Sequence, residues 1–377
     1  MLNFSRENTS LVAKWWRNVD KQVLFLFTSL FLLGLFFSFS STSSVIAEKM
    51  NKQTYFFFLK HLIFVSISLF FLISISIQDK NKLIKFLPLF FIISILFLCL
   101  VPLFGVEVKG SKRWLDFPFF PRFQPIELVK PLFILFIAKI IVIEEKKNIY
   151  SRYLYSFFLL IFIITLLITQ PDLGQSLLLI LSWITMIFVS GFNMIILSVL
   201  GLMFISIIIL LIFIFPDKFG YIFLRIKTFI DPKVGDNFQS QKALDAIKQG
   251  GLTGQGMGEG ILKDKVPEAH TDYIIAVISE EFGVILVLFI LSLFLLIGYK
   301  ALNKVFSEQD EFIKLAVVGL VSLLFIQTFI HIGVNIRLLP TTGMTLPFLS
   351  YGGSSLIGSS IIAGVILNLT RKDASRY

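Results

Sequence analysis

The sequence predicts an all-α polytopic membrane protein with about ten transmembrane helices and one large extracytoplasmic loop. Hydrophobic residues make up 56% of the 377 positions and charged residues only 15%, and the mean hydropathy is +0.86. Apolar runs of about 20 residues, the length that crosses a bilayer, recur along the whole chain. Little sequence is left for a large extramembrane enzyme domain, so we expect 1–377 to form a single integral membrane domain.

Roughly ten apolar runs account for most of the chain. They cover residues 22–46, 55–77, 83–104, 125–143, 153–170, 173–190, 192–215, 272–298, 312–336 and 350–369. The first run leads into a serine-rich segment without a clear small-x-small cleavage site, so we interpret it as a span and not as a signal peptide. Ten spans place both termini on one side, and the lysines and arginines of the short connections there make that side cytoplasmic.

Two connections on the opposite side are also basic. Residues 105–124 contain Lys112, Arg113 and Arg122, and residues 216–271 contain eight lysines and arginines. Long loops cross the membrane largely regardless of charge, but a short basic outer segment needs an explanation. An anionic ligand on the outer face is the simplest one, and contact of these cations with solvent or lipid phosphates is the alternative.

The overall charge and the cysteine content exclude several classes of protein. The formal net charge of +10 suits a chain that lies among anionic lipid headgroups or handles an anionic lipid substrate. Nucleic acid is a poor partner, because no soluble basic domain is available to bind it. The single cysteine, Cys99, excludes an internal disulfide framework, a cysteine-based zinc site and an iron–sulfur cluster.

The predicted loop 216–271 is the only connection long enough to build a site in water. Six glycines between positions 250 and 260 prevent a regular helix in that part of it. Glu259 stands where a G-x-G-x-x-G pattern needs its third glycine, and no strand precedes the segment, so a dinucleotide site is not predicted. A surface loop or a re-entrant loop is the expected structure.

Acidic residues gather where the next span begins. Asp272 lies at the mouth of this span, where it or Thr271 is a good N-cap. Alternatively, Asp272 beside His270 is a general base at the water boundary. Glu280 and Glu281 lie roughly 12–13 Å deeper in the same helix. At that depth carboxylates either face a hydrated cavity or form a structural pair satisfied by helix-end amides or an arginine.

Two further polar sets lie at or within other spans. Glu127 and Lys130 are three residues apart on one helical face, so we expect an ion pair that neutralises both charges. Asp172 directly follows Pro171 and is placed to cap the next helix.

The connection 338–355 contains two prolines and three glycines and predicts a re-entrant turn. The hydroxyl groups of Ser350 and Ser354, with the amides of a helix N-terminus, offer an anion-binding surface there. Close packing of small residues is the alternative. On the same outer side, Arg113 and Trp114 supply a phosphate-binding cation and an interfacial aromatic ring.

Taken together, these motifs resemble the SEDS family of bacterial cell-wall proteins. Residues 340–355 and 267–283 carry the resemblance, and residues 110–114, 122–130 and 170–174 reinforce it in family order. The resemblance implies a ten-helix fold. It also implies a peptidoglycan glycosyltransferase that polymerises lipid II on the outer face of the bacterial cytoplasmic (inner) membrane.

The resemblance assigns roles to individual residues. The essential acid of the family corresponds to Asp272, which would deprotonate the acceptor hydroxyl. Together with the residues selected above, the expected substrate-binding set is Lys112, Arg113, Trp114, Arg122, Glu127, Lys130, His270, Glu280, Ser350 and Ser354. The diphosphate leaving group needs positive charge, supplied by the lysines and arginines of this set alone or together with a divalent cation.

The resemblance also implies partners. These are a class B penicillin-binding protein transpeptidase, other divisome proteins and membrane lipids. Residues 256–260 and 343–347 are most similar to the division branch of the family and favour septal wall synthesis. Thr342 departs from that branch, which usually carries lysine at this position, and is closer to the elongation branch. Two alternatives are a non-catalytic scaffold for a transpeptidase and a lipid II flippase with a cavity lined by Glu127, Lys130 and Glu280.

Overall fold

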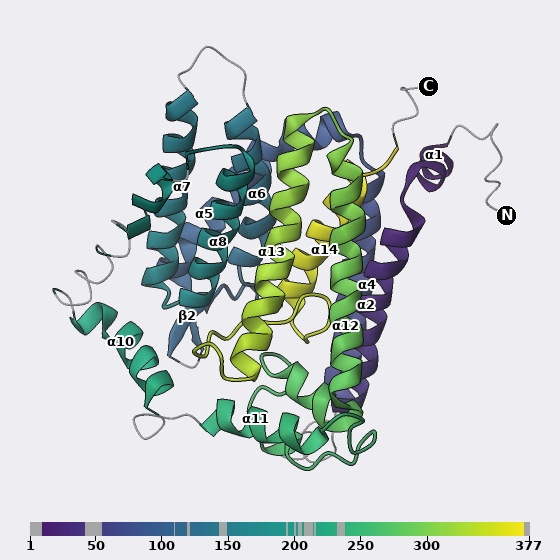
Figure 1. Ribbon diagram of the computed structural model, residues 1–377, viewed down its shortest axis with the longest axis vertical. Coiled ribbons are helices and arrows are strands. Elements are labelled where there is room, and N and C mark those ends of the chain that lie inside the picture. The colour runs from purple at the N-terminus through teal and green to yellow at the C-terminus, as the bar shows by residue number, and fades with distance from the viewer. Residues whose placement is uncertain are drawn as a thin grey trace.

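The computed structural model is a bundle of long helices, most of them running along the long axis of the molecule (Figure 1). The structure describes residues 10–41, 55–108, 110–118, 121–142, 149–193, 195–199, 201–202, 206, 214, 216–231 and 238–372. The helices are α1 (Leu11–Asn18), α2 (Lys21–Ser41), α4 (Phe56–Ile77), α5 (Lys80–Phe104), α6 (Ile126–Val142), α7 (Ile149–Thr169), α8 (Leu173–Val189), α10 (Pro216–Ile230), α11 (Phe238–Gly250), α12 (Ile274–Phe306), α13 (Glu311–Asn335) and α14 (Gly353–Leu369). Two strands, β1 (Val106–Val108) and β2 (Ser111–Trp114), and the 3-10 turn η1 (Lys263–Lys265) complete the description.

Six of the described helices are long and apolar enough to cross a membrane, namely α2, α4, α5, α7, α12 and α13. The outer helices α4 and α5 expose many phenylalanine, leucine and isoleucine side chains, whereas α6, α13 and α14 are largely buried. This arrangement is that of a polytopic all-helical membrane protein, whose apolar surface faces lipid. The predicted run 192–215 falls mostly outside the described residues, so the count of ten spans stays a prediction.

The two ends of the bundle differ. The amide of Lys372 donates to the oxygen of Asn18 at 3.1 Å, so both described ends of the chain lie at the same end. The hairpin of β1 and β2, α10 and α11 lie at the opposite end (Figure 1). The hairpin is antiparallel and pairs Val108 with Ser111. This hairpin, the helix α1 and the helices α10 and α11 within the 216–271 segment were not predicted from the sequence.

Glycines allow a close contact between α4 and α14. A Cβ atom on Gly353 would lie 2.6 Å from the ring of Phe64, and one on Gly364 would lie 2.9 Å from the oxygen of Leu72. Both distances are too short for any side chain, so glycine is required for this approach. The contact places the N-terminus of α14 next to α4, where the two helices form adjoining walls of the cavity described below.

The glycine-rich segment, residues 250–263, packs on a break in α12. Gly283 has a positive φ of 81°, and a Cβ atom there would lie 2.1 Å from the oxygen of Leu252. The amide of Gln255 donates to the oxygen of Glu280 at 2.9 Å, which satisfies a carbonyl freed by the break. The segment therefore packs on this break so closely that Gly283 cannot carry a side chain without a shift of the backbone.

Glu280 and Glu281 hold this segment in place. The two oxygens of Glu280 accept the amides of Leu262 and Lys263, each at 2.7 Å. Glu281 accepts the ammonium group of Lys263 and the hydroxyl of Ser40 on α2. Of the two expectations for these buried acids, the structure therefore shows the structural pair, with a lysine in place of the arginine considered.

Candidate active site

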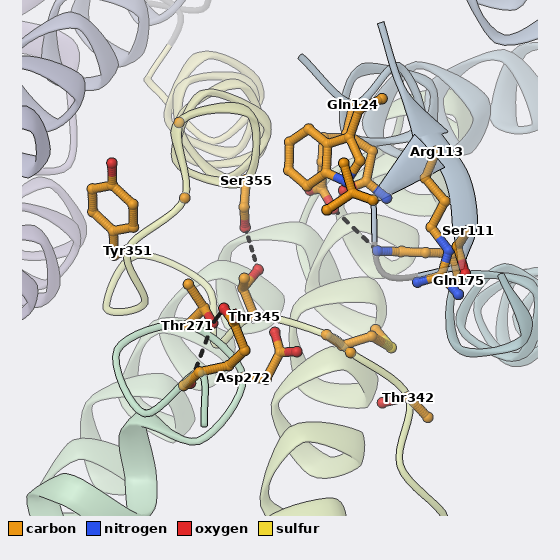
Figure 2. Close-up of a pocket in the computed structure, with 18 of the residues that line it drawn as sticks. Ser111, Arg113, Gln124, Gln175, Thr271, Asp272, Thr342, Thr345, Tyr351 and Ser355 are labelled. Atoms are coloured by element: carbon orange, nitrogen blue, oxygen red, sulfur yellow. Dashed lines mark hydrogen bonds between the residues drawn. The ribbon is translucent and has the colours of Figure 1, made fainter. Parts of the chain in front are cut away.

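A cavity of about 860 Å³ opens at the end of the bundle that carries the hairpin. Its walls come from distant parts of the chain: β2, the N-terminal ends of α6, α8 and α14, the start of α4, and the segments 268–273 and 341–345. In Figure 2, Asp272, Thr345 and Ser355 lie together, and Arg113 and Gln175 lie on the facing side.

Asp272 lines this cavity and does not cap α12. The N-cap of α12 is Tyr273, which makes no side-chain capping bond, so the capping prediction for Asp272 and Thr271 is wrong. The reason is the preceding turn: Glu268 has a positive φ of 57°, and its oxygen accepts the amides of Thr271, Asp272 and Tyr273 at 3.1 to 3.2 Å. These backbone bonds fix the turn before α12, and the Asp272 side chain lines the cavity.

Arg113 is anchored at the facing wall. Its Nε donates to the oxygen of Gln170 at 3.2 Å, and a terminal nitrogen donates to the oxygen of Pro171. Its Nε also lies 3.7 Å from the carboxylate of Asp172. Asp172 is buried and accepts the amide of Gln175 at 3.4 Å, so its predicted capping role is confirmed. Burial raises the pKa of Asp172, and the charge of Arg113 opposes that shift.

Gly343 lies between the acid and the cation. A Cβ atom built on Gly343 would be 3.6 Å from Oδ2 of Asp272 and 3.7 Å from Nη1 of Arg113. The φ of Gly343 is 69°, a conformation that favours glycine. The carboxylate and the guanidinium therefore border a shared space, and a side chain at position 343 would contact both of them.

The predicted pair of Glu127 and Lys130 is present. Their charged atoms are 2.9 Å apart, and both side chains are buried. Glu127 lines the cavity and also accepts Nε2 of Gln175 at 3.1 Å. Lys130 lies behind it and donates to Gln327 on α13 at 3.2 Å. The pair thus links α6 to α8 and α13 beneath the cavity.

One face of α13 supports the cavity wall, and sequence reasoning missed it. Its polar side chains recur at every fourth position, which places them on one side of the helix. Each binds a main-chain oxygen: Gln327 that of Thr345, His331 that of Met344 and Asn335 that of Asp272, at 2.9, 2.7 and 3.1 Å. The detectable signal was this spacing of uncharged polar residues in an apolar helix.

Other predicted residues lie on the cavity wall or directly behind it. Trp114 and Arg122 line the cavity, and Arg122 forms an exposed ion pair with Asp116 at 2.8 Å. The hydroxyl of Ser354 accepts the amide of Gln124 at 3.0 Å, and that of Ser350 donates to the oxygen of Thr271 at 2.7 Å. Both serines hold wall segments together, while Ser355 faces the cavity.

Besides Lys130, Ser350 and Ser354, which lie behind the wall, three more predicted residues do not line the cavity. Lys112 is exposed on the hairpin. The ring of His270 packs between Phe57 and Tyr351, with ring centres 5.2 and 5.8 Å away. Glu280 is occupied by the glycine-rich segment, as described above. The partners of Glu280 are distant in the sequence. They could not be predicted from the presence of a charged residue in an apolar helix.

Two cations of the cavity were not among the predicted residues. Lys60 enters it from α4, and Arg225 enters it from α10, where its guanidinium donates to the oxygen of Thr341 at 3.4 Å. In the described part of the chain, no group of three or more histidine, cysteine, aspartate or glutamate side chains could hold a metal ion.

Comparison with known proteins identifies the family. The model of the cell cycle protein family named for FtsW, RodA and SpoVE matches residues 21–375. The chain belongs to this family. The resemblance to the SEDS proteins inferred from the motifs is thereby confirmed.

Individual relatives are similar over nearly their whole length. A chain of Caulobacter vibrioides named "Probable peptidoglycan glycosyltransferase FtsW" is 30% identical over 99% of this chain and 95% of its own. "Stage V sporulation protein E" of Bacillus subtilis is 34% identical over 96% and 99%.

Two solved structures share the fold. One belongs to a study described as "Structural coordination of polymerization and crosslinking by a peptidoglycan synthase complex", with a TM-score of 0.72 and 22% identity over 93% of this chain and 97% of that one. The other is the rod shape determining protein RodA of Thermus thermophilus, with a TM-score of 0.67 and 22% identity over 94% and 97%. They support a polytopic helical membrane fold for this chain.

Proposed function

We propose that this protein is a peptidoglycan glycosyltransferase that polymerises lipid II into glycan strands, with Asp272 as the general base. The observation that carries the proposal is the carboxylate of Asp272 facing the guanidinium of Arg113 across Gly343. Glycosyl transfer from a diphosphate donor needs these two groups in one site, a base for the acceptor and a cation for the leaving group. The names of the FtsW relatives describe the same activity.

In the proposed reaction, Asp272 accepts the proton of the 4-hydroxyl of the acceptor's GlcNAc as that oxygen attacks the anomeric carbon of the donor. A carbon–oxygen bond forms there, and the bond to the diphosphate breaks. Asn335 holds the backbone of Asp272 from behind, so the carboxylate is positioned before the substrate binds.

The lipid diphosphate leaves with negative charge, and Arg113 is the cation best placed to receive it. The backbone oxygens of Gln170 and Pro171 fix its guanidinium, so little reorganisation is needed during the reaction. Arg122, Lys60 and Arg225 add positive charge around the cavity. These cations also attract the anionic substrate before the chemistry begins.

We infer a septal role in cell division beside a class B penicillin-binding protein, supported by the FtsW names among the relatives and by the synthase-complex neighbour. In this proposal the chain lies in the cytoplasmic membrane with ten spans and both termini inside. Residues 216–271 then form an extracytoplasmic loop beside the cavity.

The decisive experiment uses the purified protein in detergent with lipid II. Polymerisation needs no membrane, whereas transport does, so a glycosyltransferase forms glycan strands that a muramidase digests. Lipid II that stays monomeric in detergent but moves between leaflets in vesicles would instead indicate the flippase. The cavity lacks Glu280, one of the three residues on which the flippase alternative depended.

A further inference from the structure

A second pocket lies at the end of the bundle where the two described chain ends meet. It has a volume of about 340 Å³ and lies between the beginning of α2 and the C-terminal part of α12. Its lining consists of Lys21, Gln22, Phe25, Leu26, Leu296 and Lys300. It is remote from the cavity of Asp272, because Asp272 precedes the opposite end of α12.

The described partners of the two lysines in this pocket are uncharged groups. The ammonium group of Lys300 donates to the neutral side chain of Gln22 at 2.6 Å, and that of Lys21 lies 5.1 Å from the centre of the Trp16 ring. Among the described residues, neither lysine has an acidic partner within ion-pair distance, whereas Lys304 on the same helix is paired with an aspartate at 2.8 Å. Two such neighbouring cations favour an anionic ligand.

The apolar part of the pocket lies deeper in the bundle than the charge. On α2, Phe25 follows Lys21 by one turn, and on α12, Leu296 precedes Lys300 by one turn. The two helices run in opposite directions, so both apolar residues lie toward the middle of the bundle. Phe25 and Leu296 are nevertheless 69% and 44% exposed, which is the expected exposure of a lipid-facing surface.

We propose that this pocket binds an anionic phospholipid. The phosphate lies between the ammonium groups of Lys21 and Lys300, and an acyl chain lies along Phe25 and Leu296. A phospholipid has the same order of charge and apolar surface along the membrane normal. A free phosphate would bind the two ammonium groups, but it has no acyl chain to contact Phe25 and Leu296. Trp16 beside Lys21 has the position of an interfacial aromatic residue at the headgroup level.

Native mass spectrometry of the full-length protein in detergent tests this proposal. Phosphatidylglycerol and phosphatidylethanolamine are added separately at equal concentrations. The wild-type protein is expected to retain phosphatidylglycerol preferentially. The double variant Lys21→Gln/Lys300→Gln should lose this preference, with affinity for phosphatidylglycerol falling roughly fivefold per lysine. Lys21→Arg/Lys300→Arg keeps the charge and should keep the preference.

A matched control removes two other lysines from the same end of the bundle. Lys82→Gln/Lys85→Gln neutralises exposed lysines at the start of α5, outside the pocket, and should retain phosphatidylglycerol as the wild type does. Equal loss in the two glutamine double variants would mean that net charge, and not this pocket, attracts the lipid. Unchanged retention after Lys21→Gln/Lys300→Gln would overturn the proposal.

Two further measurements keep the test independent of folding. Glycerol 3-phosphate carries the headgroup charge without acyl chains, and it should not displace the bound lipid. If it binds as tightly as phosphatidylglycerol, the site is a phosphate site and the lipid assignment is wrong. Should the double variant unfold, the single variant Lys21→Gln changes only an exposed side chain and should show about half of the effect on a logarithmic scale.

Discussion

Asp272 and Arg113 are fixed by backbone atoms on opposite walls of the cavity. The turn oxygen of Glu268 fixes the main chain at Asp272, and the oxygens of Gln170 and Pro171 fix the guanidinium of Arg113. The two side chains belong to different walls of the cavity. Replacing one of them should therefore leave the wall that carries the other intact. Single substitutions at this scale should therefore separate chemistry from folding.

Asp272→Asn should leave the protein folded and abolish polymerisation of lipid II. The amide has nearly the same shape but cannot accept a proton, so a loss of about 100-fold or more is expected. Asp272→Glu should retain little activity, because its carboxylate is displaced by one methylene. Strand formation from lipid II in detergent measures the activity, and thermal unfolding measures the fold.

The control for this substitution is Asp245→Asn, which removes an acid from α11 outside the cavity. It should polymerise lipid II as the wild type does. Near wild-type rates for Asp272→Asn would eliminate Asp272 as the base.

Gly343→Ala should lower activity by more than its effect on stability explains. The methyl group would lie between Oδ2 of Asp272 and Nη1 of Arg113, and the positive φ adds strain of about 1–2 kcal/mol. Gly191→Ala is the matched control, because Gly191 has a φ of 81° and no atom near its Cβ position. Equal losses of polymerase activity in the two variants would show that strain alone is responsible.

At the scale of elements, long apolar runs predicted the main helices because membrane spans need little beyond length and hydrophobicity. Charges such as Glu127 and Asp272 were found because charged residues within or beside a span are rare. The short hairpin and the amphipathic helix α1 are too short to give a sequence pattern as clear as a long apolar run. Glu280 was predicted to bind substrate but does not line the cavity, and its partners, the amides of Leu262 and Lys263, are identifiable only in three dimensions.

The ion pair between α6 residues Glu127 and Lys130 should behave as a coupled unit. Glu127→Gln and Lys130→Met each leave one buried charge without its partner, at a cost of about 3–5 kcal/mol. The double variant should be destabilised by clearly less than the sum of the two. A double-mutant cycle on thermal unfolding in detergent measures this difference, and simple additivity would show that the two side chains do not interact.

At the scale of the whole molecule, the cavity and the two described ends of the chain, near Asn18 and Lys372, lie at opposite ends of the bundle. The basic connections predict that the chain ends face the cytoplasm. This prediction places the cavity on the outer side of the membrane.

Cysteine labelling in intact cells tests this orientation. In a Cys99→Ala background, an impermeant thiol reagent should label Gln249→Cys on α11 and not Lys82→Cys at the start of α5; both positions are exposed. Ser240 in the same segment is buried and is a poor reporter. Labelling of position 82 without labelling of position 249 would show that the predicted orientation is the wrong way round.

The polar face of α13 has a consequence for how this protein can diverge. Gln327, His331 and Asn335 bind main-chain oxygens of the cavity wall and no side chain there. A main-chain oxygen is present whatever residue occupies the position. The side chains at Met344 and Thr345, which line the cavity, can therefore change in the course of evolution while their main chain keeps its place. Descendants can acquire a different preference for the sugar or peptide of the substrate without rebuilding the bundle.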